Sequence, residues 1–336
     1  MSEEASSGTI HGHSVRLTML EGGRRRSLAW SELGGLDFSR FGLVLGAGGA
    51  TGAAFEAGIL LAMAVDHGVR LADANTVIGT SAGAIGASLV TLGFEAADIA
   101  ALITENPIHL SPLAARHSVR FVTEVPPLPP VRAILRLPTP HRAVGTAKML
   151  LAGRVSSSVL PLLRTGHFDF APYLDFLGDA SWPSAPGSLK ICATDLMTGA
   201  RVVFDGSTEE KLANAVAASC AVPAIMRPVS AGGRLCVDGA MSSPTNADLL
   251  VDEEAAGDLV VVISPMSGRR ARTMAGAMSA RFAALRLSRE LRRFHSDQRV
   301  IVVEPAAALS ELVVDDAMSG GSSRRILGSA FVGASA

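Results

Sequence analysis

Residues 41–60 read FGLVLGAGGATGAAFEAGIL, and this stretch indicates the class of fold. A short apolar run at 41–45 precedes a loop of glycines and other small residues at 46–52. An Ala/Leu-rich segment then extends to about His67. A run of five apolar residues suits a buried strand, and the longer segment suits a buried helix. The order strand, glycine loop, helix predicts a sheet with helices packed on its faces.

The same unit recurs at residues 76–92, TVIGTSAGAIGASLVTL, as a short strand, a sharp turn and a close-packed helix. Further strands are expected at 189–193, 201–204, 234–237, 259–263 and 300–303, with helices at 209–219 and 274–294. Alternating strands and helices predict an α/β fold with a mostly parallel central sheet and helices on both faces.

Three parts are expected along the chain. Residues 1–40 are predicted to be an N-terminal accessory segment with a short strand at 15–20 and a basic run at 24–26. Residues 41–265 form the core domain, and residues 266–336 supply C-terminal helices and a last strand packed on the same domain. An insertion at about 107–170 begins rich in proline and arginine, which excludes long regular elements, so we expect an irregular cap there.

Composition narrows the function classes. A net charge of −1 and 4 % aromatic residues argue against nucleic acid as a partner. The three cysteines, an odd number in apolar settings, suit reduced thiols and predict a cytoplasmic protein. We expect no secretory signal, because the N-terminal residues lack a basic start followed by an apolar run. Oligomeric state is not readable from the sequence.

Ser81 is the candidate nucleophile. It lies in the pentapeptide Gly79-Thr80-Ser81-Ala82-Gly83, between an expected strand and an expected helix. Glycines on both sides of such a serine permit a tight, strained turn that exposes the hydroxyl, and the helix N-terminus favours a developing oxyanion.

The loop at 46–52 is the candidate oxyanion hole. A dinucleotide-binding fingerprint fails because Thr51 stands where its third glycine is needed, and no Lys-Ser/Thr pair forms a phosphate loop. Small residues leave backbone amides free to point at one oxygen. The loop precedes Ser81 by one strand-helix unit, so both are expected at the same end of the sheet.

Asp238 is the candidate base, in Val-Asp-Gly-Ala directly after an expected strand. None of the eight histidines follows a strand in a glycine-bounded turn. An Asp-Gly turn with only a structural role is the simpler interpretation of Asp238 taken alone.

These motifs together resemble the patatin-like phospholipases, lipid acyl hydrolases that act through a Ser-Asp dyad without histidine. The resemblance covers about residues 41–265 and includes two further blocks, ATDL at 193–196 with Thr198-Gly199, and ASCAVP at 218–223. It implies a patatin-like α/β/α fold and the following site residues: Ser81 as nucleophile, Asp238 as general base and acid, Gly48, Gly49 and Ala50 as oxyanion donors, and Gly79 and Gly83 around the nucleophile.

Two departures from the family pattern bear on activity. Thr51 stands where the family usually carries Arg or Lys, and Ala47 where it has a further glycine. Ser242-Ser243-Pro244-Thr245-Asn246 replaces the paired asparagines that often precede a proline. The expected substrate is a lipid carboxylic ester, of the phospholipase A, lysophospholipase or esterase type, with no cofactor and no metal.

Two alternatives remain open from the sequence. The fold could serve as a lipid-binding or interaction module with weakened catalysis, or the site could be an α/β-hydrolase triad of Ser81, Asp238 and His295. The arginines of the 274–294 helix are most simply a solvated face. A surface that contacts anionic lipid, peripheral to a membrane, is the other interpretation.

Overall fold

The structure is a computed structural model of the 336-residue chain. It describes residues 14–105, 110–113, 166–177, 180–184, 188–207, 209–251, 253, 257, 259–318 and 320–335. The predicted cap at about 107–170 lies outside the described residues, apart from 110–113 and 166–170.

Ten strands of the described chain form one mixed sheet, in the order β2-β1-β10-β9-β3-β4-β5-β8-β7 with β6 paired to β5. Strands β10, β9, β3, β4 and β5 are parallel to one another. The strand bounds are β1 Val15–Glu21, β2 Arg24–Leu28, β3 Phe41–Leu45, β4 Ala74–Thr80, β5 Leu189–Asp195, β6 Arg201–Phe204, β7 Val229–Ala231, β8 Arg234–Asp238, β9 Leu259–Ile263 and β10 Arg299–Pro305. The predicted α/β class is confirmed.

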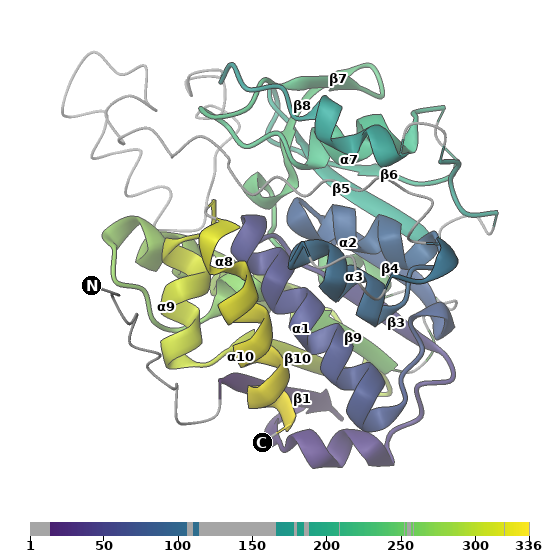
Figure 1. Cartoon of the computed structure of the whole chain (residues 1–336), viewed down its shortest axis with the longest axis vertical. Helices are drawn as coiled ribbons and strands as arrows, with labels where there is room; N and C mark the ends of the chain where they lie inside the picture. Colours follow the sequence, from purple (N-terminus) through teal and green to yellow (C-terminus); the bar gives the residue numbers. More distant parts are fainter. Residues whose placement is uncertain are drawn as a thin grey trace, which may run out of the picture.

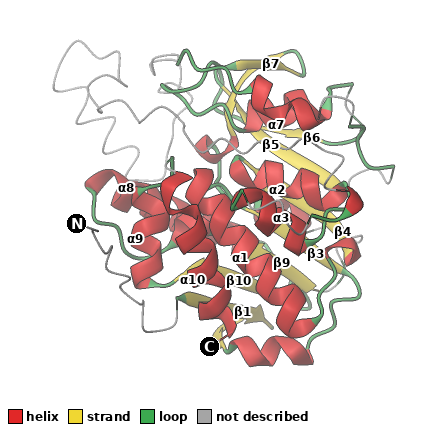
Figure 2. Cartoon of the chain, in the orientation of Figure 1, coloured by secondary structure: helices red, strands yellow, loops and turns green. Residues whose placement is uncertain are grey.

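Helices cover both faces of the sheet (Figures 1 and 2). The α-helices of the described residues are α1 Gly49–His67, α2 Ala82–Thr91, α3 Ala96–Ile103, α7 Leu212–Ser219, α8 Met274–Leu291, α9 Ala307–Asp315 and α10 Ser323–Ser335. Short 3-10 helices are η1 Trp30–Gly35, η2 Leu71–Asp73, η5 Ala171–Leu177, η6 Gly239–Met241, η7 Ala247–Leu250, η9 Pro265–Ser267 and η10 Gly320–Ser322.

Two apolar clusters separate these layers. The larger one joins α1, α2, α3, α7, α9 and α10 to one face of the sheet. The smaller one joins α8 and η7 to the other face, against alternate residues of β3, β9 and β10 such as Val44, Val262 and Val302. The central strands are buried on both faces, which explains their continuous apolar runs.

The edges of the sheet are antiparallel. Strands β1 and β2 pair with each other and β1 pairs with β10, so residues 15–28 of the expected accessory segment are part of the main sheet. At the other edge, β8 runs antiparallel to β5, with Asp238 opposite Ala193. This reversed direction brings the end of β8 to the level at which β4 ends, because Thr80 pairs with Cys192 of β5.

Helix α1 is the one helix of the described chain that is long and apolar enough to cross a bilayer by length and composition. Most of it is buried inside the fold, between the sheet and α10, which lies beside it (Figure 1). Its apolar character is therefore explained by its place in the core.

Candidate active site

Ser81 lies between the last residue of β4 and the first residue of α2, with φ 55° and ψ −121°. A positive φ is rare and costly for a residue with a Cβ, and here the surroundings hold it. The Ser81 amide donates to Ser219 Oγ at 2.8 Å, and Ser219 Oγ donates in turn to the Cys192 carbonyl at 2.6 Å. The Cys220 thiol contacts the Ser81 carbonyl at 3.2 Å.

Gly83 shows why the turn needs glycine. A Cβ placed on Gly83 would lie 2.1 Å from the carbonyl oxygen of Leu45, the last residue of β3. Any side chain there would push the start of α2 away from the glycine loop that follows β3. The absence of a side chain at Gly83 thus lets the Ser81 turn and the candidate oxyanion loop touch each other.

Asp238 faces Ser81 directly. Ser81 Oγ donates to Asp238 Oδ2 at 2.6 Å, and the Ala240 amide donates to Asp238 Oδ1 at 2.8 Å. Both side chains are buried, with 7 % of Ser81 and 4 % of Asp238 exposed. The backbone of Asp238 is fixed as well, because its amide donates to the Ala221 carbonyl at 2.9 Å.

Burial changes the acid strength of this carboxyl. Loss of solvent raises the pKa of Asp238 from 3.8 to about 6, and the hydrogen bonds from Ser81 and Ala240 offset only part of that effect. A carboxylate with a pKa near 6 is a stronger base than an exposed one, yet it is still ionised at neutral pH.

Gly48 is the N-cap residue of α1, and Gly49 and Ala50 are the first two residues of that helix. Among the residues that the structure describes, no backbone carbonyl accepts from their amides, as is usual for the first turn of a helix. Two hydrogen bonds fix the residues just before them: the Gly46 amide donates to the Ile263 carbonyl, and the Ala47 amide donates to the Pro244 carbonyl. Such fixed, unused donors are the chemistry that an oxyanion hole requires.

Thr51 replaces the cation that the resemblance implies and has a different attachment. Its hydroxyl donates to the Val313 carbonyl at 2.8 Å and lies 3.3 Å from the Gly48 carbonyl. Val313 is in the last turn of α9, where carbonyls lack partners within the helix. Thr51 is fully buried, so it ties the glycine loop to the C-terminal part of the chain.

His295 lies at the opposite end of the parallel strands, where they begin. It lines a surface cleft together with Leu259 and Arg299, the first residues of β9 and β10. Ser81 instead follows the last residue of β4, and these strands are parallel. The structure therefore does not bring His295 to Ser81 and Asp238.

The other chemical groups considered from the sequence are also located. The three cysteines are free and buried. No group of three or more His, Cys, Asp or Glu side chains suited to a metal ion occurs among the described residues. Gly79 is the second-last residue of β4 and Gly83 is the second residue of α2, so they lie on either side of Ser81.

Three residues around the pair were not predicted as site residues. Ser219 lies in the ASCAVP block and holds the Ser81 amide, and only its place in that block hinted at a role. Asn246 donates from Nδ2 to Thr80 Oγ1 at 3.0 Å. Glu290 of α8 is buried behind the loop that follows Asp238, in a helix whose sequence indicated only an arginine-rich exposed face.

Comparison with known proteins gives one family match and one similar solved structure. The family model for patatin-like phospholipases matches residues 43–251. No curated protein sequence matches the chain. Among solved structures, the chain is similar to VipD from Legionella pneumophila, with a TM-score of 0.35 and 16 % sequence identity. That match covers 78 % of this chain and 55 % of VipD, so the chain spans about half the length of that protein.

Proposed function

The chain belongs to the patatin-like phospholipase family, and from this we propose that it is a serine hydrolase that cleaves carboxylic esters of lipids, with Ser81 as nucleophile and Asp238 as base. The family supports lipid acyl hydrolysis as the general activity. The observation that carries the proposal is the 2.6 Å hydrogen bond from Ser81 Oγ to the buried Asp238 carboxylate.

In the first half of the proposed reaction, Asp238 removes the proton of the Ser81 hydroxyl as Ser81 Oγ attacks the ester carbonyl carbon. The carbonyl oxygen becomes an oxyanion, which the amides of the glycine loop at Gly48 and Gly49, with Ala50 beside them, stabilise. Collapse of this intermediate breaks the bond to the alcohol. The protonated Asp238 returns the proton to the leaving oxygen, which leaves Ser81 acylated.

The second half repeats these steps with water. Asp238 takes a proton from a water molecule as its oxygen attacks the acyl carbonyl, and the same amides stabilise the second oxyanion. The Ser81–acyl bond breaks, Asp238 returns the proton to Ser81, and the fatty acid leaves. Each proton that Asp238 accepts is given back, so the enzyme returns to its starting state.

A carboxylate alone serves both steps because of where it lies. At an ordinary pKa of 3.8, Asp238 would be a poor base for an alcohol, whereas burial brings the pKa to about 6. The hydrogen bond from Ser81 Oγ already holds the carboxylate where it can accept the proton. This combination supports a dyad with no histidine.

We further propose that the protein meets its lipid from the water side. The exposed side chains of α8 include Arg281 and Arg289, and Arg292 directly after the helix is exposed as well; anionic headgroups would attract all three. Co-sedimentation with anionic vesicles, compared with zwitterionic ones, tests this contact. Equal binding to both vesicle types in low salt would exclude a role for these charges.

Hydrolysis of nitrophenyl esters of increasing acyl length tests the main proposal. The wild type is compared with Ser81→Ala, Asp238→Asn and His295→Ala, each checked for folding by circular dichroism. We expect Ser81→Ala and Asp238→Asn to lose turnover by a factor of 10³ or more, in the range seen for such residues. His295→Ala is expected to keep it, because His295 lies where the parallel strands begin and Ser81 follows the end of one.

Two results would contradict the proposal. A large loss in His295→Ala would favour a triad. A folded wild type that neither hydrolyses any ester nor labels at Ser81 with a fluorophosphonate would favour a lipid-binding or interaction module. The preferred acyl length measures the depth of the acyl site.

A further inference from the structure

One short segment contacts all three loops of the proposed acyl-transfer site. Residues 242–247, the loop that follows η6, run from the base toward α8. The Asn246 side chain donates to Thr80 Oγ1, next to the nucleophile, at 3.0 Å. The Pro244 carbonyl accepts from the Ala47 amide of the glycine loop at 2.8 Å. The Ser242 hydroxyl donates to the carbonyl of Gly239, which follows the base, at 3.0 Å.

This segment cannot hold its shape by regular structure. Asn246 has φ 53°, in the left-handed region that a residue with a side chain rarely adopts. Its Nδ2 also donates to the Ser243 carbonyl at 2.7 Å, which closes a tight turn. A strained turn of this kind persists only when surrounding contacts determine it.

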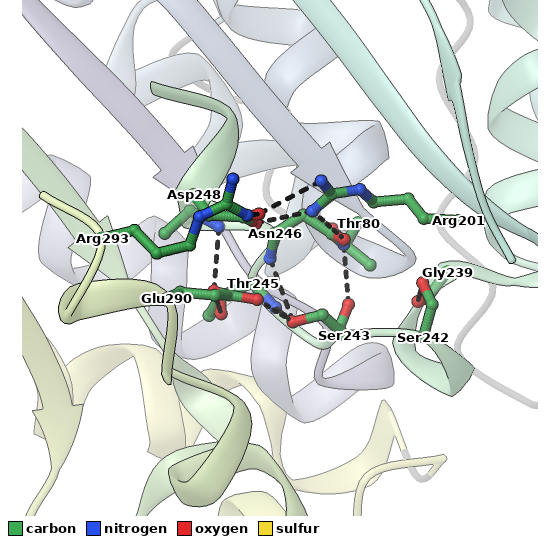
Figure 3. Close-up of polar contacts among 11 residues, drawn as sticks. Thr80, Arg201, Gly239, Ser242, Ser243, Thr245, Asn246, Asp248, Glu290 and Arg293 are labelled. Carbon is green, nitrogen blue, oxygen red and sulfur yellow. Dashed lines mark hydrogen bonds and ion pairs between the residues drawn. The ribbon is translucent and has the colours of Figure 1, made fainter. Parts of the chain in front are cut away.

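Glu290 supplies those contacts from α8. Its carboxylate accepts from the Ser243 hydroxyl, from the Thr245 hydroxyl at 2.6 Å and from the Ala247 amide at 3.0 Å. Figure 3 shows the Glu290 side chain pointing into the segment between Ser243 and Thr245. Glu290 is 7 % exposed, so these three donors take the place of water around the carboxylate.

A carboxylate at this position needs a reason, because a buried charge is costly. Burial raises the pKa of Glu290, and the nearby Asp248 carboxylate raises it further, while the hydrogen bonds from Ser243, Thr245 and Ala247 lower it. A simple packing role would favour an apolar side chain. Three donors instead converge on its two oxygens, and a charged acceptor makes stronger hydrogen bonds than a neutral one.

Neighbouring charges fix the residue that directly follows this segment. Asp248 pairs with Arg201 of β6 at 2.6 Å and also with Arg293, just after α8. Figure 3 shows these guanidinium groups on either side of Asp248. Glu290 itself lies 39 positions beyond the region matched by the family model, which ends at residue 251.

We propose that Glu290 is a positioning residue that holds residues 242–247 and, through them, the relative placement of the nucleophile, base and oxyanion loops. This inference rests on the proposed ester hydrolysis. It gives the arginine-rich helix α8 an indirect role in turnover. Glu290 acts only through its hydrogen bonds to Ser243, Thr245 and Ala247.

The test measures kcat and KM for a soluble nitrophenyl ester, with melting temperature, in the full chain. Glu290→Gln keeps the shape but removes the charge. We expect kcat to fall by on the order of tenfold or more, since misplacement of about 1 Å can cost 10²-fold, with KM within about twofold. Thr245→Ser, which keeps the hydroxyl, is expected to retain wild-type kcat, whereas Thr245→Val is expected to lose part of it.

Asp98→Asn is the matched control. Asp98 on α3 is also buried and also accepts three hydrogen bonds, from the Ser111 amide, the Ser111 hydroxyl and the Glu95 amide. These partners lie outside the catalytic loops, so the substitution is expected to lower the melting temperature and leave kcat within about twofold. A kcat loss in Glu290→Gln that Asp98→Asn does not share supports positioning.

Each remaining result decides against the inference. Wild-type kcat in Glu290→Gln, or equal losses in Glu290→Gln and Asp98→Asn, overturns it while the proposed function stands. If Glu290→Gln does not fold, equal kcat for Thr245→Val and Thr245→Ser overturns it. A wild type with no activity on any ester overturns the proposed function and this inference with it.

Discussion

The hydroxyl of Ser81 and the carboxylate of Asp238 are 2.6 Å apart, although 157 positions separate them in the sequence. Ser81 is held by the end of a central parallel strand, and Asp238 by the end of an antiparallel strand that arrives from the opposite direction. Both are buried, so the hydrogen bond between them forms in a medium that strengthens it and raises the pKa of the carboxyl.

Hydrolysis should depend on pH through Asp238. A base with a pKa of about 6 is protonated and inactive below that pH and ionised above it. We therefore expect kcat/KM for a soluble ester to fall about tenfold for each pH unit below about 6, and to level off above about 7. A rate that stays constant from pH 5 to pH 8 would contradict this assignment.

A histidine could produce a similar profile, because an unperturbed imidazole titrates at about 6.5. The control is the same profile measured on His295→Ala. We expect its inflection to stay where the wild type has it, since His295 lies at the opposite ends of the strands from Ser81. Loss of the inflection in that variant would assign the titration to His295.

Asp238→Asn should be more stable than the wild type at neutral pH. The folded-state pKa of about 6 exceeds the ordinary 3.8, so folding disfavours the ionised carboxyl, and wild-type stability falls as pH rises from about 4 to 6. Removing the charge should raise the free energy of unfolding by on the order of 1–3 kcal/mol at pH 7.5. Urea unfolding at pH 7.5 and pH 4 measures this, and the difference should shrink toward zero at pH 4.

Asp195→Asn should have the opposite sign and serves as the comparison. Burial by itself would raise the pKa of Asp195, but hydrogen bonds from the Thr198 amide, the Arg234 guanidinium and the Met197 amide outweigh it and hold the pKa below its ordinary value. Its stabilising effect is therefore present at neutral pH and lost as pH falls. A gain in stability in Asp195→Asn at pH 7.5 would show that loss of charge alone explains the Asp238 result.

The central strands could be predicted from sequence because burial on both faces leaves a continuous apolar run. Strands β3, β6 and β9 have the predicted bounds, and β4, β5, β8 and β10 extend the predicted runs by one to four residues. The family resemblance is confirmed by the match over residues 43–251. The roles of Ser81 and Asp238 stay predictions, which the variants above test.

The features that could not be predicted from the sequence depend on contacts between elements far apart in the chain. The antiparallel direction of β8 depends on its pairing with β5, which no local pattern encodes. Glu290 is a charged residue in a helix with exposed arginines, so the sequence suggests an exposed position. Only the packing of the fold shows that it is buried. In the sequence, Thr51 indicates only the loss of a cation, whereas in the structure its hydroxyl donates to a carbonyl of α9 far along the chain. Polar residues with distant partners are invisible to periodicity.

Thr51→Val should weaken the glycine loop, whereas Thr51→Ser should not. Valine has the shape of threonine but cannot donate to the Val313 carbonyl, which would stay buried without that partner. We expect the free energy of unfolding to fall by about 1–2 kcal/mol and kcat to fall with it, because the loop carries the proposed oxyanion donors. Serine keeps the donor and should preserve kcat. Equal kcat in the two variants would show that this hydrogen bond does not contribute to turnover.

Gly49→Ala and Gly68→Ala, at the two ends of α1, distinguish the effect of backbone strain from that of a steric collision of the added Cβ. Both glycines have positive φ, 60° and 65°. A Cβ on Gly68 meets nothing within 4 Å, so its replacement should cost only about 1 kcal/mol of stability, from backbone strain.

A Cβ on Gly49 would lie 2.1 Å from the Ala317 carbonyl oxygen. That collision with backbone must displace either the loop or the segment after α9. We therefore expect Gly49→Ala to lose more stability in urea unfolding than Gly68→Ala and to lose ester turnover by on the order of 10²-fold, as removal of an oxyanion donor does. If Gly49→Ala turns over esters as fast as Gly68→Ala, the amides of this loop are not the oxyanion donors.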